Sequence, residues 1–263
     1  IKERDPKLVF SGNITSDSKI LTNRNIIERA KTIMPYLTYD ENPYMVISNE
    51  GELIWVLDAY TTTNNYPYSQ RTMLENNGIT KFEINYIRNS VKVLINAYSG
   101  DVTFYITDKT DPIVMVYANI YPDLFTDDAI PEDISSHFVY PEYLYNIQAN
   151  ILERYHNVQP DILYRSDDVW DIATYNSSSR MTSTRGTDIS PYYTMVKTTD
   201  SNSSRLGLVL PYTPYEKQNI TAYLVGSCDE NGNNVLKLYN LTDDSNAIGP
   251  MQLDTQLGQD ETI

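Results

Sequence analysis

The apolar segments of this chain are all short, and turn-forming residues separate them. The longest, Leu53 to Leu57 and Ile113 to Ala118, have the length of a strand or a short helix, far below the ~18 residues that cross a bilayer. Strands and helices come in groups, with few strand–helix–strand alternations. The pattern predicts an α+β fold with mixed or antiparallel sheets built from hairpins, packed against several helices, and a β-rich C-terminal part.

Turn signals between β-rich runs indicate hairpins. Asn49-Glu50-Gly51, Tyr98 to Asp101 and Asp229 to Asn234 each separate two runs rich in β-branched and aromatic residues. Each turn therefore predicts a pair of antiparallel strands. The predicted strands are 44–48, 52–61, 81–96, 102–108, 192–198, 205–210, 221–228 and 235–241.

Helix start signals precede three segments. Asn25 followed by Glu28 fits a capping box, and Asp111-Pro112 fits an N-cap with proline at the first helical position. The strongest helical pattern follows Tyr140 and has one apolar stripe, which we expect to face a sheet. The stripe consists of Leu144, Ile147, Ile151, Leu152 and Tyr155.

Changes in composition divide the chain into three parts. Residues 1–174 form the predicted α+β domain, and residues 175–204, rich in Ser, Thr and Asn, a predicted loop or linker. Residues 205–263 form a β-rich part that we expect to pack on the first domain. The acidic residues beyond Lys237 predict a solvated tail.

Charge and cysteine content exclude some function classes. The chain has 20 Lys and Arg against 35 Asp and Glu, a formal net charge of −15. Such a field repels phosphates, so we predict no nucleic-acid partner. The single cysteine, Cys228, excludes an intrachain disulfide and a four-cysteine zinc site. It is expected to be a small buried hydrophobe.

The sequence has none of the common catalytic motifs. It contains no G-x-S-x-G, G-x-G-x-x-G, P-loop or H-E-x-x-H motif, and only two histidines. His156, at the end of the strongest helix, fits a structural role better than a catalytic one. Asp167 and Asp168 are acidic candidates for a site, but their spacing is not that of a calcium loop. No metal and no cofactor are predicted.

The strand 81–96 carries unusual polar residues within an apolar run. Such side chains must find partners, because an unpaired buried donor costs about 1–3 kcal/mol. We expect one hydrogen-bonded cluster, which is either an internal network that fixes the fold or a site for a polar ligand. Its candidate residues are Asp58, Tyr66, Tyr68, Ser69, Asn85, Arg88, Asn89 and Ser90.

Several segments, in order along the chain, resemble one known family. They are Gly51 to Thr63, Tyr66 to Ser69, Ile84 to Lys92, Asp101 to Tyr105, Asp111 to Ile113, Tyr121 to Phe125, Tyr140 to Tyr145 with Gln148, and Tyr155-His156. The chain is identified by them as similar to uncharacterised protein family 0182, bacterial multi-pass membrane proteins with a large domain outside the membrane. The membrane-spanning region of that family is missing here, so we expect this chain to be a piece of a longer protein.

The resemblance implies a location but no reaction. It implies the extracytoplasmic side of the cell membrane, with attachment through spans that this chain lacks. The first hypothesis is a non-enzymatic binding or interaction module with an envelope protein or polymer as partner. The alternative is an extracytoplasmic hydrolase acting on a cell-wall or surface polymer. Val91 to Tyr105 also looks like the strand–turn–strand of small secreted protease-regulating modules.

Overall fold

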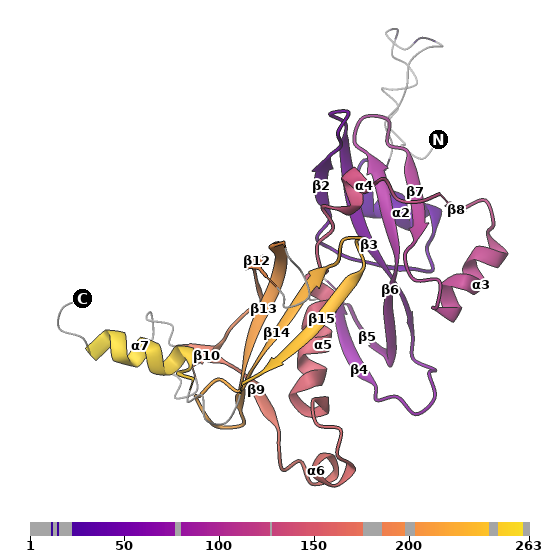
Figure 1. The fold of residues 1–263 in the computed structure, drawn as a ribbon. Helices are drawn as coiled ribbons and strands as arrows, with labels where there is room; N and C mark the ends of the chain where they lie inside the picture. The colour runs from indigo at the N-terminus through magenta and orange to yellow at the C-terminus, as the bar shows by residue number, and fades with distance from the viewer. Residues whose placement is uncertain are drawn as a thin grey trace.

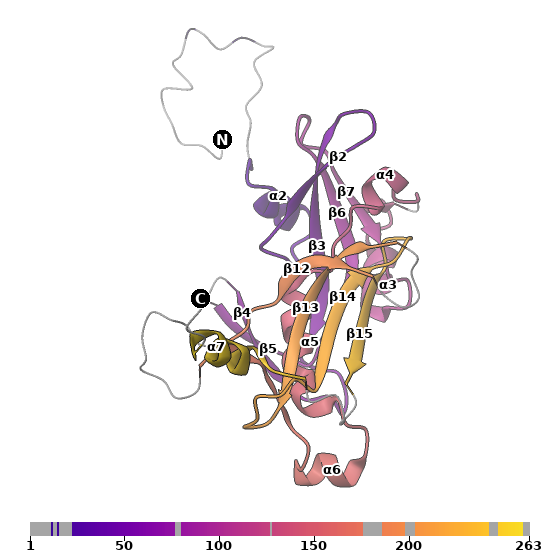
Figure 2. The ribbon, with the colours of Figure 1, turned by 60° about the vertical axis from the view of Figure 1, so that its left-hand side comes forward.

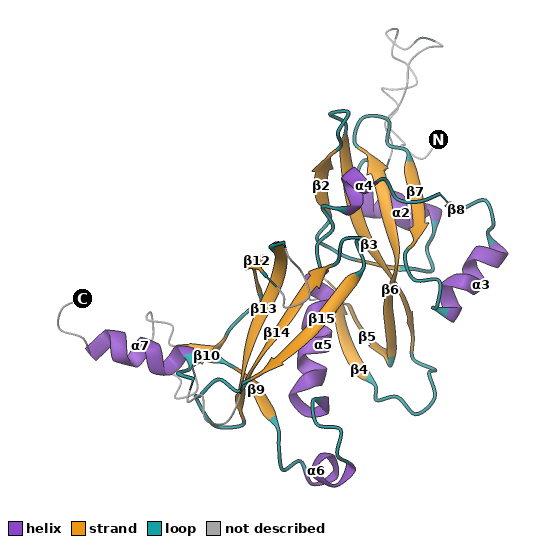
Figure 3. Cartoon of the chain, in the orientation of Figure 1, coloured by secondary structure: helices purple, strands orange, loops and turns teal. Residues whose placement is uncertain are grey.

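Two large sheets with helices around them form the body of the protein (Figures 1 and 3). The structure is a computed structural model, and it describes residues 12, 15, 23–76, 80–126, 128–175, 186–197, 203–241 and 247–259. Helices and strands alternate in groups and the sheets are mainly antiparallel, so the predicted α+β class is confirmed.

The first sheet has the strand order β1-β3-β6-β7-β8, with β2 also paired to β3. The hairpins predicted at Gly51 and at Tyr98 to Asp101 join β2 to β3 and β6 to β7. Among the described strand pairs of this sheet, β7 and β8 alone run parallel. The strands are β1 (Thr38–Tyr39), β2 (Tyr44–Ile47), β3 (Leu53–Thr63), β6 (Tyr86–Asn96), β7 (Val102–Ile106) and β8 (Phe125–Thr126).

Two capped helices cover one face of this sheet, α2 (Ile26–Ile33) and α3 (Pro112–Ile120). The Asn25 side chain accepts hydrogen bonds from the first-turn amides of α2, and Asp111 accepts one from Ile113 of α3. Both predicted caps are thus confirmed. Ala30 and Val114 are fully buried, which fixes the two helices on the core of strands β3, β6 and β7.

The second sheet has the strand order β12-β13-β14-β15, and β9 also pairs with β13. The predicted hairpin at Asp229 to Asn234 joins its last two strands. A two-stranded sheet of β10 and β11 lies next to it in sequence. The strands are β9 (Trp170–Ile172), β10 (Thr174–Tyr175), β11 (Thr187–Asp188), β12 (Tyr192–Val196), β13 (Arg205–Pro214), β14 (Ala222–Cys228) and β15 (Asn234–Asn240).

The helix α5 (Glu142–Tyr155) packs across one face of the second sheet (Figures 1 and 2). Tyr145 donates a hydrogen bond to the carbonyl of Leu224 on β14, and Tyr212 of β13 donates one to the carbonyl of Ala149, each at 2.8 Å. A Cβ atom at Gly226 would lie 2.8 Å from the Tyr145 ring, so glycine permits this close approach.

The predicted apolar stripe of this helix is partly wrong. Leu144 is buried, but Ile151 is 45% exposed and Tyr155 is 41% exposed. Tyr145 and Ala149 are buried instead, because the helix is rotated so that the hydroxyl of Tyr145 reaches a backbone carbonyl of β14. Ile147 and Ile151 line a cavity beside the helix.

The remaining elements are short and peripheral. The acidic tail predicted beyond Lys237 instead contains α7, whose Gln252 donates a hydrogen bond to Asn219 at 3.0 Å. The strands β11 and β12 lie within the range 175–204, of which residues 176–185 and 198–202 are outside the described residues; the domain boundaries stay a prediction. No helix in the described ranges is long and apolar enough to span a bilayer. The elements are β4 (Thr72–Asn76), β5 (Thr80–Ile84), α4 (Glu132–Ser135), α6 (Pro160–Arg165) and α7 (Pro250–Gln259).

Candidate functional site

A bulge in β6 determines where its polar side chains point. The register moves from Ala59–Val91 to Thr61–Arg88, so two steps along β3 match three steps along β6. An extra residue shifts the alternation of side chains between the faces of a sheet. As a result, the polar residues predicted to form one cluster are divided between both faces of the sheet and a nearby loop.

On the face covered by α3, the residues collect around Asp111. This carboxylate is fully buried and accepts hydrogen bonds from the hydroxyls of Thr61, Ser90 (2.5 Å) and Tyr86 (2.8 Å). Burial acts to raise the pKa of Asp111, but these bonds and the Ile113 amide outweigh it and lower the pKa. Burial and the bond to Asp111 raise the pKa of Tyr86 to about 12. The group is a structural cap.

On the opposite face, Lys92 forms an ion pair with Asp58. Lys92 is 1% exposed and Asp58 is 4% exposed, and the ammonium also lies 4.9 Å from the centre of the Phe138 ring. Burial raises the pKa of Asp58, and the lysine counteracts this only in part. The pair places two charges inside the protein, and Lys92 also lines a cleft between the two sheets.

Asn85 interrupts the strand and holds the loop that contains Tyr66 and Ser69. Its side chain accepts from the Tyr66 amide at 3.0 Å and donates to the Tyr66 carbonyl at 2.7 Å, while Ser69 donates to the Asn85 carbonyl. Tyr66 stacks on Tyr86 with ring centres 5.2 Å apart. Tyr68 projects fully into solvent with a φ of 58°. These residues form a surface group that contacts the Asp111 group through the stack of Tyr66 on Tyr86.

Arg88 takes partners outside the predicted cluster, whereas Asn89 has partners both inside it, at Asp58, and outside it. Nη1 of Arg88 donates to Asp108 at 3.0 Å and to Thr110 at 2.9 Å. Asn89 donates to the carbonyl of Ala59 and accepts from Asn234 of the second sheet, at 3.0 Å. The residues predicted to form one cluster are therefore divided among several groups, because the bulge and the second sheet supply partners that the local sequence does not contain.

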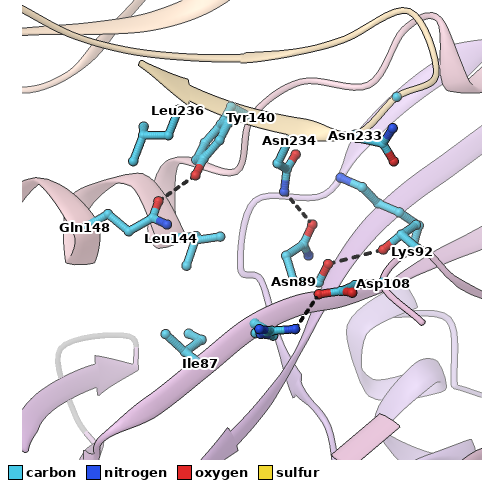
Figure 4. A pocket seen from close by; sticks show the side chains of 13 residues that line it. Ile87, Asn89, Lys92, Asp108, Tyr140, Leu144, Gln148, Asn233, Asn234 and Leu236 are labelled. Atoms are coloured by element: carbon cyan, nitrogen blue, oxygen red, sulfur yellow. Dashed lines mark hydrogen bonds and ion pairs between the residues drawn. The ribbon is translucent and has the colours of Figure 1, made fainter. Parts of the chain in front are cut away.

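A cleft of about 430 Å³ lies where Asn89 meets the second sheet (Figure 4). Its walls come from β6, from the segment after β7, from α5 and from the start of β15. In Figure 4 the Asn89–Asn234 bond crosses the cleft and the Tyr140–Gln148 bond, 2.6 Å long, lies at one end. Amide, phenol and guanidinium groups thus converge on one solvent-accessible space.

Two further cavities extend this cleft in both directions. One, of about 380 Å³, shares Arg88, Leu144 and Gln148 with it and continues between α5 and the strands β4 to β6. The other, of about 660 Å³, shares Thr107 and Asn233 with it and continues toward α4. We call the three together the interlayer groove. Because these neighbouring cavities share lining residues, together they suit an elongated ligand.

His156, Asp167 and Asp168 do not belong to the groove. The His156 ring stacks on Trp170 at 3.6 Å, Nδ1 lies 2.9 Å from the Leu152 carbonyl, and Nε2 lies 3.3 Å from Asp168. Asp167 lies 3.7 Å from Arg165. The histidine thus ties the end of α5 to β9, which is the structural role that its position predicts.

A separate cavity of about 660 Å³ lies between β9, β11 and α7, and most of the charged side chains that line it are carboxylates. Glu153, Asp171, Asp188 and Glu216 line it, together with Lys217. Within the described residues, no three His, Cys, Asp or Glu side chains gather closely enough to hold a metal ion. A further acidic residue, Asp127, lies outside the described residues.

Comparison with known proteins identifies the family. The model of the uncharacterised protein family UPF0182 matches residues 1–263. This chain belongs to UPF0182. UPF0182 proteins of Caldicellulosiruptor saccharolyticus, Methanospirillum hungatei and Alkaliphilus metalliredigens are 43%, 40% and 40% identical over 99%, 98% and 98% of this chain. The chain covers 27%, 28% and 26% of those proteins. No solved structure matches it.

The groove of this UPF0182 chain includes residues that the sequence did not single out. Only Lys92 left a recognisable signal, since a lysine between two valines in an apolar strand needs a buried partner. The others come from segments far away in the chain and carry no local pattern. These residues are Lys92, Asp108, Tyr140, Gln148, Asn233 and Asn234.

Proposed function

We propose that this chain is an extracytoplasmic binding module that holds an elongated polar ligand in the interlayer groove. The observation that carries the proposal is the convergence of Arg88, Gln148 and Asn233, from three separate elements, on the central cleft of this groove. Concave sites with a few convergent polar groups are the usual form of a ligand site. The Asn89–Asn234 bond and the buried Lys92–Asp58 pair hold the walls in place.

The charges in the central cleft favour binding over hydrolysis. Asp108 is the carboxylate that lines it, with a partly exposed side chain, and it is already paired with Arg88. Asp58 lies behind the wall in its own ion pair. Hydrolysis by paired carboxylates needs two acids on either side of the scissile bond. The described lining of the central cleft offers one.

A site-specific crosslinking experiment tests the binding proposal. A photoreactive phenylalanine derivative replaces Asn233, which lines the cleft, in the full-length protein within its native cell envelope. The matched control carries the same photoreactive residue at Tyr164 of α6, which is 89% exposed and lines none of the three cavities of the groove. We expect the photoreactive residue at position 233 to form a discrete adduct with the ligand. The additional substitution Arg88→Ala should weaken this adduct, and the photoreactive residue at position 164 should not form it. Equal labelling at both positions would refute the proposal.

Membrane attachment rests on the family resemblance alone, and the relatives, about four times as long as this chain, leave room for membrane spans outside it. Labelling of intact cells with a membrane-impermeant maleimide tests on which side of the membrane this domain lies. Tyr164→Cys provides an exposed thiol, while the native Cys228 is only 5% exposed and gives little background. Labelling before cell lysis is expected. Labelling only after lysis would place the domain inside.

The location that we assign to the hydrolase alternative is the carboxylate-lined cavity of Glu153, Asp171, Asp188 and Glu216. Incubation of the full-length protein with cell wall from its own host, followed by measurement of released reducing ends, tests it. Activity that Asp188→Asn and Glu216→Gln abolish, and that Asn233→Ala leaves intact, would establish the hydrolase. If the unmodified protein releases no more reducing ends than the Asp188→Asn/Glu216→Gln double variant, the hydrolase alternative is refuted.

A further inference from the structure

We infer that the ligand of the interlayer groove is an extended polypeptide that pairs with the open edge of β15 as an added strand. This inference rests on the proposed function and names its ligand class. The last strand of the second sheet is β15, which has β14 on one side and no strand on the other among the described residues (Figures 1 and 2).

The backbone of β15 presents a regular set of unpaired groups at this edge. The amide of Leu241 bonds the carbonyl of Thr221, and the amide of Asp229 bonds the carbonyl of Asn233. Pairing with β14 is antiparallel, so it uses every second residue of β15. The odd-numbered residues therefore bond β14. The N–H and C=O groups of Leu236 and Leu238 point to the open edge.

That edge faces the interlayer groove. Asn234 and Leu236 line the cleft, opposite Arg88 and Asn89 of the first sheet. At seven residues, β15 is the longest strand at an edge of the second sheet, since β12 has five and β9 has three. Proteins usually protect such edges with proline or several charges. The β15 segment has no proline, and Lys237 is its one charge.

The floor of the groove adds side-chain selectivity. Leu144, Ile147 and Ile151 occupy successive turns of α5 and line the groove, although Ile151 is 45% exposed. An added strand would direct alternate side chains toward this floor. The ligand should therefore carry apolar residues at every second position. Because the chain has a net charge of −15, the other positions should be neutral or basic.

A peptide fits this edge better than a polysaccharide. Two edge residues of β15 offer donors and acceptors in the repeating order of a backbone ladder, which another peptide backbone matches group for group. A sugar chain lacks that repeat. Strand addition obtains affinity from the main chain and specificity from alternate side chains.

Fluorescence anisotropy with the full-length protein tests the inference. The probe is a library of seven-residue peptides with Val, Ile, Leu or Phe at alternate positions and Lys, Thr, Ser or Asn between them. The tightest binder is then remade with N-methyl groups on either alternate set of amides. Methylation of the amides that face β15 should weaken binding about tenfold or more, because several backbone hydrogen bonds are lost. Methylation of the other set of amides should weaken binding about twofold or less.

Two protein variants and a sugar control complete the test. Ile151→Arg should weaken the peptide at least as much as the first methylated set, whereas Tyr164→Arg on α6, also exposed, should have no effect. Equal loss from both methylated sets would overturn strand addition. Binding of chito-oligosaccharide without peptide binding would overturn the ligand class but leave a binding module. Absence of peptide binding would overturn the inference. The crosslinking experiment at Asn233 tests the proposed function independently of this result.

Discussion

Two buried carboxylates on opposite faces of the first sheet are stabilised in different ways. Asp111 is surrounded by neutral donors, the hydroxyls of Thr61, Ser90 and Tyr86 and a helix amide, which lower its pKa. Asp58 has one ammonium partner, Lys92, and its pKa is raised by burial. Oriented neutral donors satisfy a buried charge without burying a second one. The Asp58 side instead carries the desolvation of two charges.

The largest effect is expected from breaking the pair on the Asp58 side. Lys92→Met leaves a buried carboxylate without its counter-charge and should reduce the free energy of unfolding by about 3–5 kcal/mol. Urea denaturation followed by circular dichroism measures it. The double variant Lys92→Met/Asp58→Leu removes both charges and should recover stability to near that of the unmodified protein. A single variant as stable as the unmodified protein would show that the pair contributes nothing.

A smaller loss is expected on the Asp111 side. Asp111→Ala removes a helix cap and leaves three hydroxyls without their acceptor, so the free energy of unfolding should fall by about 2–3 kcal/mol. The matched control is Asp108→Ala, since Asp108 is a partly exposed ion-pair partner nearby, with an expected loss of about 0–1 kcal/mol. Similar losses in the two variants would contradict the described network.

The pH dependence of the free energy of unfolding should have opposite signs for the two carboxylates. The folded pKa of Asp111 is lowered, so its contribution is present above about pH 4 and is lost as the pH falls through the lowered value. The folded pKa of Asp58 is raised, so its contribution decreases as the pH rises through the raised value. Asp111→Asn should flatten the loss of stability below pH 4, measured by thermal unfolding. An unchanged acid limb would contradict the lowered pKa.

The smallest perturbation uses Cys228 as a reporter on the Asp58 side. Burial raises the pKa of this thiol to about 12, with smaller opposed effects of Lys92 and Asp58. At pH 8 the folded protein should react with a disulfide reagent about 10³-fold more slowly than the unfolded chain, because thiolate is the reactive form. Because Lys92 lowers the pKa of the thiol, Lys92→Met should slow the reaction of the folded protein further, whereas Asp111→Ala should leave it unchanged. Fast reaction of the folded, unmodified protein would show that this side is open.

The sequence by itself determined the elements whose signals are local. Asn25 and Asp111 cap helices through bonds to residues two or three positions away, and Gly51 turns a hairpin with a φ of 82°. Few alternatives compete for such short contacts, so composition and spacing predict them. The same locality makes the strands around Asp229 to Asn234 recognisable.

Only the tertiary structure decided the groove and the partners of the polar strand. The bulge between Arg88 and Val91 depends on pairing with β3, some thirty residues earlier, and Asn89 meets Asn234 across 145 positions. The buried side of α5 was decided by where Tyr145 meets β14. A one-residue change in strand register moves every side chain to the other face. Local sequence therefore supplied the polar residues, and long-range pairing chose what they contact.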